Sequence, residues 1–343
     1  MKQAFPEIVG NRALCERLAG EITGGTFPHA YIIEGAHGTG KHTLARLIAA
    51  ALCCENRQSQ AHPLPCGVCL SCRKILGGNS TDVILKNRGD KATFGVDVIR
   101  EVRSDVYVAP NDGDAKVYIL EEADLLTSQA QNAFLLTLEE PPPYVVFLLL
   151  CENAGTLLET VRSRAPTVRT EPIPPHLIEE HLCRISVDAA SLRATAPSEF
   201  FEIIAASDGS IGRALELLDP KTRKPILDKR RKAREFARLC AERRSGVESL
   251  RLLQSFGQKR DELLANLASV KLCLRDLLLL KQTDTAPLCF FTDREEAGAL
   301  AYRFTTPELL RLCDVIMTAE EQLKRNANVR LTVTSLAVSA GLL

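Results

Sequence analysis

The sequence lacks the features of a membrane-spanning, secreted or strongly charged protein. No run of about 18 or more apolar residues occurs in its 343 residues, so we expect no transmembrane helix. The first seven residues contain no apolar segment of the kind found in signal peptides, which favours a cytoplasmic protein. Lys and Arg together number 43, as do Asp and Glu. Whole-chain charge therefore gives no argument for nucleic-acid binding.

Cysteine is plentiful, with 12 residues, but a disulfide framework is not expected in a reducing compartment. Eight cysteines are scattered and are interpreted as small core residues. The other four are Cys66, Cys69 and Cys72, in a C-x2-C-x2-C pattern, and Cys54 upstream. Four thiolates predict a closed, structural Zn²⁺ site in a module at about residues 53–75. Cys53 in place of Cys54, His62 as a weaker ligand, an iron–sulfur cluster, redox thiols and plain core cysteines are the alternatives.

Short apolar runs alternate with helical patterns over residues 1–170. This alternation predicts an α/β domain with a mainly parallel sheet covered on both faces. The expected strands are 30–34, 82–85, 116–120, 144–150 and 167–169, and the expected helices are 43–52, 98–106, 128–138 and 157–163.

A proline-rich stretch at residues 171–175 ends this first domain. Residues 171–220 are predicted to form a small helical domain, with helices at 200–206 and 211–218, and residues 221–343 an all-α domain with breaks near 245–246, 283–292 and 305–307. Residues 221–234 hold eight basic side chains and one acid. We interpret this basic run as a solvated linker or helix face, with contact to a phosphate backbone as the alternative.

The residues from Gly35 to Lys41 match the G-x-x-x-x-G-K pattern of a phosphate-binding P-loop. The pattern follows an expected strand and opens an expected helix, which is the context that the motif requires. Glycines, here Gly35, Gly38 and Gly40, let the backbone N–H groups wrap phosphates, and Lys41 would reach the β and γ oxygens. The sequence therefore predicts a site for ATP or ADP.

Two positions depart from the pattern of a hydrolysing P-loop enzyme. The Ser or Thr that holds Mg²⁺ is replaced by His42, and Thr43 lies one residue too late, about 100° around the helix. The strand that should end in Asp-Glu ends in Glu121-Glu122. Because imidazole is a poor ligand for a hard cation, we expect nucleotide binding with weak or absent Mg²⁺-dependent hydrolysis. A strand-end acidic pair without a catalytic role is the alternative for Glu121 and Glu122.

Together with the P-loop and the cysteine module, residues 132–142 (NAFLLTLEEPP) and Ser163-Arg164 resemble the bacterial DNA polymerase III clamp-loader family. The resemblance implies an AAA+ P-loop domain with an inserted four-cysteine zinc module, a small helical lid and an all-α C-terminal collar. It also implies that Arg164 is an arginine finger acting on a neighbouring subunit's nucleotide. Ala165 follows where family members have Cys.

Within the family, the drifted metal positions and residues 5–11 and 29–35 resemble the delta-prime subunit more than the gamma/tau motor. Residues 209–215 resemble the sensor-2 segment, which places Arg213 at the nucleotide, and residues 326–331 resemble a collar motif. Cys151-Glu152-Asn153 stands where a motor has Thr-Thr, and only Asn153 could orient a water. The implied partners are gamma/tau and delta subunits, with the sliding clamp and primer-template DNA reached through the complex. An active, gamma-like ATPase and an unrelated P-loop enzyme with a zinc knuckle are the alternatives.

Overall fold

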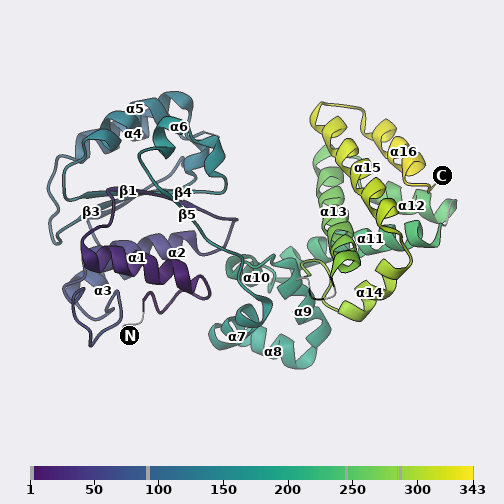
Figure 1. Cartoon of the computed structure of the whole chain (residues 1–343), viewed down its shortest axis with the longest axis horizontal. Coiled ribbons are helices and arrows are strands. Elements are labelled where there is room, and N and C mark those ends of the chain that lie inside the picture. The colour runs from purple at the N-terminus through teal and green to yellow at the C-terminus, as the bar shows by residue number, and fades with distance from the viewer. Residues whose placement is uncertain (1–3, 90–92, 244–245, 284, 286–287, 343) are drawn as a thin grey trace. The chain divides into compact units, whose positions relative to one another are not determined.

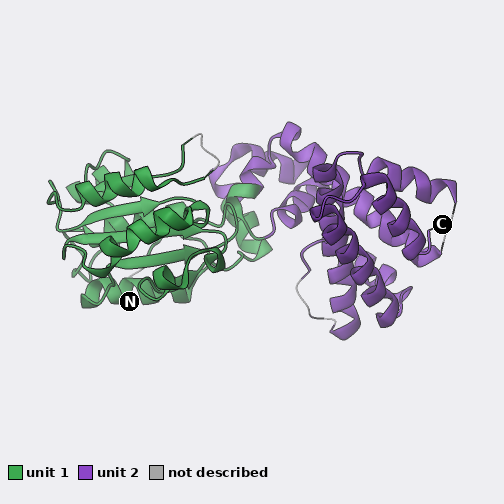
Figure 2. Cartoon of the chain, turned by 90° about the horizontal axis from the view of Figure 1, so that it is seen from above, with its two compact units in different colours: residues 1–181, 209–213 green, residues 182–208, 214–343 purple. Residues whose placement is uncertain are grey.

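The chain forms two compact units, which Figure 2 shows in green and purple. The structure, a computed structural model, describes residues 4–89, 93–243, 246–283, 285 and 288–342. Unit 1 comprises residues 1–181 and 209–213, and unit 2 comprises residues 182–208 and 214–343. The division into a lid at 171–220 and a collar at 221–343 stays a prediction.

Unit 1 contains a five-stranded parallel sheet with the strand order β2-β3-β4-β1-β5. Parallel pairing runs through the whole sheet, which confirms the predicted α/β class. Three strands have the predicted bounds, whereas β2 and β4 begin and end one residue later than expected. The strands are β1 (Ala30–Glu34), β2 (Val83–Lys86), β3 (Lys116–Leu120), β4 (Val145–Cys151) and β5 (Thr167–Arg169).

Both faces of the sheet are covered by helices, with α1, α2 and α3 on one face and α4, α5 and α6 on the other (Figure 1). Strands β3 and β4 are buried along their whole length, as their continuous apolar sequences predict. Unit 1 also contains two short 3-10 helices, η1 (Ala123–Leu125) and η2 (Ala154–Thr156). The α-helices of this part are α1 (Arg12–Gly24), α2 (Lys41–Leu52), α3 (Leu70–Leu76), α4 (Val96–Asp105), α5 (Ser128–Glu139) and α6 (Glu159–Arg162).

The regular elements in the described residues of unit 2 are helices, and their core is built around Phe236, Phe256 and Phe290. None of the helices in the described ranges is long and apolar enough to cross a membrane. The helices from α7 onward are α7 (Pro175–Ile185), α8 (Val187–Thr195), α9 (Pro197–Ala206), α10 (Ile211–Glu216), α11 (Pro220–Glu242), α12 (Val247–Ser255), α13 (Arg260–Gln282), α14 (Arg294–Tyr302), α15 (Thr306–Lys324) and α16 (Val329–Ser339).

Of the two interpretations of the basic run at residues 221–234, a linker is wrong, because these residues lie in the 23-residue helix α11. The Asp219 side chain caps the helix by accepting from the Lys221 N–H, and Pro220 stands in the first turn, where it needs no donor. Of the predicted helix breaks, the one at 305–307 separates α14 from α15. Residues 244–245, 284 and 286–287, within the other two predicted breaks, lie outside the described residues.

Candidate functional site

The P-loop connects β1 to α2 in unit 1, as the sequence predicts. Gly40 precedes α2 at φ 87°, a left-handed conformation that favours glycine. A Cβ on Gly35 would lie 1.9 Å from Oγ1 of Thr170, so only glycine fits where the loop leaves the sheet. The sheet order places the end of β4 beside the end of β1 and the end of β3 next to that of β4, and ligands of open parallel sheets bind at this edge.

Lys41, in the first turn of α2, is only 7% exposed and points back into the loop. Its Nζ donates to the carbonyl oxygens of Gly35 at 2.5 Å and Ala36 at 2.9 Å. Burial lowers the pKa of Lys41, while the nearby Glu152, Cys151 and Asp124 act in the opposite direction. The loop thus holds a buried ammonium group at the position from which a P-loop lysine contacts phosphates.

The two residues that depart from the metal-binding pattern contact each other. Nδ1 of His42 lies 2.6 Å from Oε1 of Glu121, and the second carboxylate oxygen of Glu121 accepts from Nδ2 of Asn87 at 3.3 Å. Thr43 is exposed on the first turn of α2. The side chains at the two predicted Mg²⁺ positions therefore contact each other between the P-loop helix and the end of β3.

Glu122, the next acidic residue, also pairs with a basic side chain. Nε of Arg88 lies 2.8 Å from Oε2 of Glu122, whose backbone is left-handed at φ 52°. Asn153, at the end of β4, uses its Oδ1 to accept from the Gly155 N–H at 2.8 Å and so caps η2. The groups that would position and polarise a water thus have partners within the chain.

The segment resembling sensor 2 contacts the P-loop directly. The Gly212 N–H donates to the Gly38 carbonyl at 3.2 Å, and a Cβ on Gly38 would lie 2.3 Å from Oγ of Ser210. The Arg213 N–H donates to the same Ser210 hydroxyl at 3.0 Å. Glycine at 38 and 212 is therefore required by this close approach, which brings the start of α10 onto the loop.

Arg164 follows α6 and is tied to α5. Its Nη2 lies 2.6 Å from Oε1 of Glu139, and its Nη1 donates to the Thr160 carbonyl at 3.0 Å. The side chains of Arg164 and Glu139 are 35% and 44% exposed. Glu139 belongs to the NAFLLTLEEPP segment, so the structure joins the two motifs that carried the resemblance.

The structure brings together the sulfur atoms of Cys54, Cys66, Cys69 and Cys72, which all lie within 4.8 Å of one another and are buried. Four Zn–S bonds of about 2.3 Å in a tetrahedron would separate the sulfurs by about 3.8 Å. The Sγ atoms of Cys66 and Cys72 are 3.9 Å apart. The four thiols therefore fit a structural Zn²⁺ ion.

Neighbouring N–H groups stabilise the thiolate form of Cys66 in the cluster. Burial alone would raise the pKa of Cys66, but hydrogen bonds from the Asn56 side chain and from backbone N–H groups, including that of Cys69, lower it to about 6. Burial raises the pKa values of Cys54 and Cys72. Several buried thiolates repel one another, so a cation among them is what would stabilise the charged form.

The alternatives to Cys54 lie elsewhere. Sγ of Cys53 donates to the Ala115 carbonyl at 3.4 Å, and burial raises the pKa of Cys53 to about 11. His62 is exposed and does not belong to the group of four thiols. Among these candidates, only Cys54 completes the cluster.

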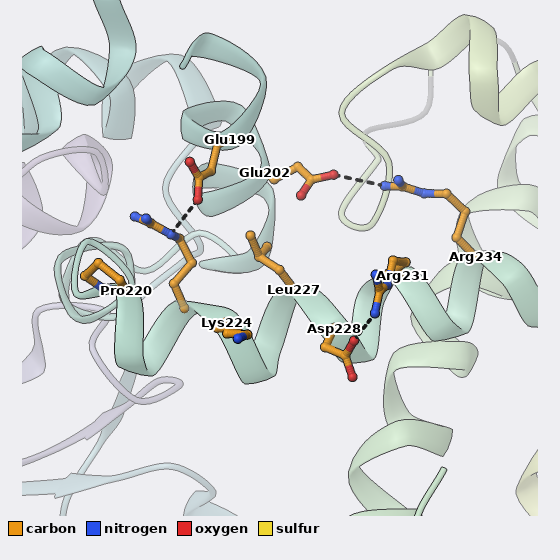
Figure 3. A pocket seen from close by; sticks show the side chains of 9 residues that line it. Glu199, Glu202, Pro220, Lys224, Leu227, Asp228, Arg231 and Arg234 are labelled. Atoms are coloured by element: carbon orange, nitrogen blue, oxygen red, sulfur yellow. Dashed lines mark hydrogen bonds and ion pairs between the residues drawn. The ribbon is translucent and has the colours of Figure 1, made fainter. Parts of the chain in front are cut away.

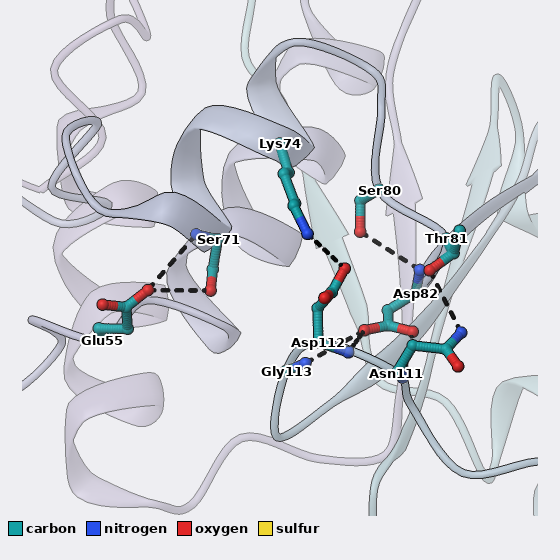
Figure 4. Close-up of polar contacts among 9 residues, drawn as sticks. All are labelled: Glu55, Ser71, Lys74, Ser80, Thr81, Asp82, Asn111, Asp112 and Gly113. Carbon is teal, nitrogen blue, oxygen red and sulfur yellow. Dashed lines mark hydrogen bonds and ion pairs between the residues drawn. The ribbon is translucent and has the colours of Figure 1, made fainter.

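Polar contacts tie the cysteine module to the rest of unit 1 (Figure 4). Lys74 of the module forms an ion pair with Asp112 at 2.9 Å, while Ser71 Oγ donates to Glu55 within the module at 3.3 Å. Asp82, just before β2, accepts from the backbone N–H groups of residues 111–113 at 2.7–3.1 Å. The module is thus anchored to the loop that precedes β3.

Comparison of the sequence with known proteins identifies the family. Residues 10–174 match the family model described as "DNA polymerase III, delta subunit". The chain is 36% identical over 218 residues to DNA polymerase III subunit tau of Bacillus subtilis, covering 63% of this chain and 37% of that protein. It is 38% identical over 149 residues to subunit delta' of Yersinia pestis, covering 43% of each. The chain belongs to the DNA polymerase III clamp-loader subunit family.

The matched region spans about two fifths of the length of these curated relatives. A solved structure of a gamma subunit-related protein from Thermotoga maritima is 18% identical, covers 95% of this chain and 98% of that chain, and superposes with a TM-score of 0.43. The α/β AAA+-like fold of this clamp-loader family member follows from its own five-stranded sheet and P-loop.

Most of the basic side chains at residues 221–234 of this clamp-loader family member form contacts within unit 2. Figure 3 shows part of it beside a cavity of about 470 Å³ between α9 and α11. Arg223 pairs with Glu199 at 2.9 Å, and Arg234 with Glu202 at 3.6 Å. Arg230 is 7% exposed and donates to the carbonyls of Cys289 and Phe290. Lys232 and Arg231 share Asp228. Lys221 and Lys224 remain exposed.

Sequence reasoning missed the partners that occupy the candidate site. Asn87 and Arg88 follow β2 and hold Glu121 and Glu122, and Glu139 holds Arg164. The position of Asn87 and Arg88 directly after a strand was a usable signal, because the carboxyl ends of parallel strands converge at one edge. Glu139 gave no such signal, since its partner lies 25 residues away.

Proposed function

We propose that the chain is a delta-prime-type clamp-loader subunit that hydrolyses ATP weakly or not at all. It would help to load the sliding clamp on primed DNA as part of a complex with gamma/tau and delta subunits. The contact between His42 and Glu121 carries this proposal. A metal-dependent hydrolase needs oxygen ligands at these positions, and here the two side chains bind each other.

The other groups near the loop support the same reading. Glu122 would polarise the attacking water in a motor subunit, but it pairs with Arg88 at 2.8 Å. The Asn153 side-chain oxygen, which could orient that water, instead accepts from the Gly155 N–H. The site keeps its phosphate-binding backbone and its lysine while its hydrolytic side chains are engaged elsewhere.

The chemical contribution of the subunit would come from Arg164, given to the nucleotide of a neighbouring ATPase. A guanidinium is planar, always protonated and able to bind two oxygens, which suits the charge that develops on a γ-phosphate. Arg164 is 35% exposed, and its guanidinium pairs with Glu139 at 2.6 Å. An exposed pair of this kind is weak enough to exchange for a stronger anionic partner.

We also infer that Cys54, Cys66, Cys69 and Cys72 hold a structural Zn²⁺ ion. Four thiolates close the coordination sphere, so the ion would stabilise the module and leave no open position for chemistry. The N–H groups that point at Cys66 and Cys69 would orient the sulfurs around it.

An active gamma-like ATPase is the second candidate, because the match to subunit tau covers more of this chain than the match to subunit delta'. The turnover of Mg·ATP by the purified chain separates the two. We expect negligible turnover that Lys41→Ala leaves unchanged. Rapid turnover that Lys41→Ala abolishes would refute the scaffold role and establish the motor.

A further inference from the structure

The contact between His42 and Glu121 also bears on which form of the nucleotide the loop accepts. His42 lies in the first turn of α2, and its side chain is 57% exposed. Glu121 follows β3, and its side chain is 17% exposed. At 2.6 Å, a ring nitrogen and a carboxylate oxygen attract each other only if the nitrogen carries a proton, as Nδ1 does in the imidazolium and in one neutral tautomer.

Mg²⁺, which the P-loop fold implies, does not fit these residues. The ion requires near-octahedral oxygen ligands at about 2.0–2.1 Å. His42 offers no oxygen, and both oxygens of Glu121 are engaged, one by His42 and the other by Asn87. Coordination of the ion by either oxygen of Glu121 would compete with the contact that this oxygen makes and would place a divalent cation beside His42.

Phosphate groups fit the same loop without a metal. The Lys41 ammonium is almost fully buried in the loop, and Gly40 and Gly35 adopt the close backbone geometry that phosphate wrapping requires. His42 follows Lys41 directly, and in its imidazolium form it can donate from Nδ1 to Glu121 and from Nε2 to an anion. Glu121 limits the rotation of this ring by holding Nδ1.

We propose that this P-loop binds a nucleoside di- or triphosphate in its metal-free form, with the His42 imidazole, positioned by Glu121, in place of Mg²⁺. The proposal rests on the nucleotide site of the proposed function. It deepens that function by naming the ligand as the bare polyphosphate rather than its magnesium complex. Because His42 offers no oxygen and both oxygens of Glu121 are engaged, we expect the affinity to be independent of Mg²⁺.

The test is titration of the full chain with a fluorescent N-methylanthraniloyl derivative of ADP, in excess Mg²⁺ and in excess EDTA. We expect the two dissociation constants to agree within about twofold, and Lys41→Ala to abolish binding in both conditions. The double variant His42→Thr/Glu121→Asp restores oxygen ligands. Its affinity should be at least about tenfold higher with Mg²⁺ than in EDTA.

If the double variant does not fold, Glu121→Gln provides a second test, because it keeps the shape of the side chain and removes its charge. This variant should bind more weakly by the same factor with and without Mg²⁺. A wild-type affinity that collapses in EDTA would overturn the proposal, as would the absence of binding in both conditions. Neither result would bear on the proposed role of Arg164, which is tested by the ATPase rate of a neighbouring subunit.

Discussion

The buried carboxylate of Asp276 should be one of the most sensitive positions for the stability of unit 2. Asp276 lies on α13 and is fully buried. Its Oδ2 accepts from the N–H groups of Cys289, Phe290 and Phe291 at 2.9, 2.7 and 3.2 Å. Arg230 of α11 donates to carbonyls of the same turn. A carboxylate and a guanidinium thus hold both sides of one backbone segment.

Asp276→Ala should lower the free energy of unfolding, because two backbone N–H donors that water cannot reach would lose their acceptor. Phe290 and Phe291 are 0% and 3% exposed, so their N–H groups would have no replacement partner. Each unpaired buried donor costs about 1–3 kcal/mol, which sums to about 2–6 kcal/mol for the pair. Asp276→Asn keeps an oxygen in place and loses only the charge, so it should cost about 1–3 kcal/mol.

Hydrogen–deuterium exchange of the amides at 289–291, with chemical unfolding of the full chain, measures this loss. The matched control is Asp82→Ala, which removes a carboxylate that also binds three N–H groups, although those of Asn111 and Asp112 belong to exposed residues that water can serve. We expect the control to leave exchange at 289–291 unchanged. Unchanged protection of Phe290 and Phe291 in Asp276→Ala would refute the reasoning.

Two further predictions concern the metal and the finger. Cys69→Ser should lower both the thermal unfolding midpoint and the zinc content measured by atomic emission. Cys53→Ser, outside the cluster, should keep the zinc. Undiminished zinc in Cys69→Ser would exclude the site. Glu139→Gln should raise the ATPase rate of a reconstituted complex by up to about fivefold, because it removes a surface ion pair of about 0.2–1 kcal/mol that competes for Arg164. A lower rate would show that Glu139 instead positions the arginine finger.

Local patterns in the sequence predicted the elements that frame the site. Strands β1 and β3 have the predicted bounds because each is a short, mainly apolar run, and β5 has one buried apolar residue, Val168, between two exposed polar residues. The P-loop was predictable because its glycines have a mechanical role, as the clash of a Cβ at Gly35 with Thr170 shows. The start of helix α11 was left open between a linker and a helix face although Asp219-Pro220 is a helix-start signal, because the basic run was given more weight.

Contacts between distant elements could not be predicted in this way. The sequence singled out His42 and Glu121 separately as departures at one metal site, but not their mutual contact. The pairing of Arg164 with Glu139 and the binding of residues 289–291 by Asp276 also depend on how helices pack. Periodicity specifies which face of an element is buried and does not specify which polar side chains meet across it.

The proposed contribution of this subunit to ATP hydrolysis in a neighbour depends on Arg164. The direct test is the steady-state ATPase of the reconstituted clamp-loader complex containing Arg164→Ala, with Arg162→Ala as a control at an exposed arginine two residues away. Because an arginine finger contributes about a thousandfold or more to phosphoryl transfer, we predict that the complex assembles and loses the share of its ATPase due to the adjoining site. An unchanged ATPase with Arg164→Ala, or an equal loss with Arg162→Ala, would contradict the account.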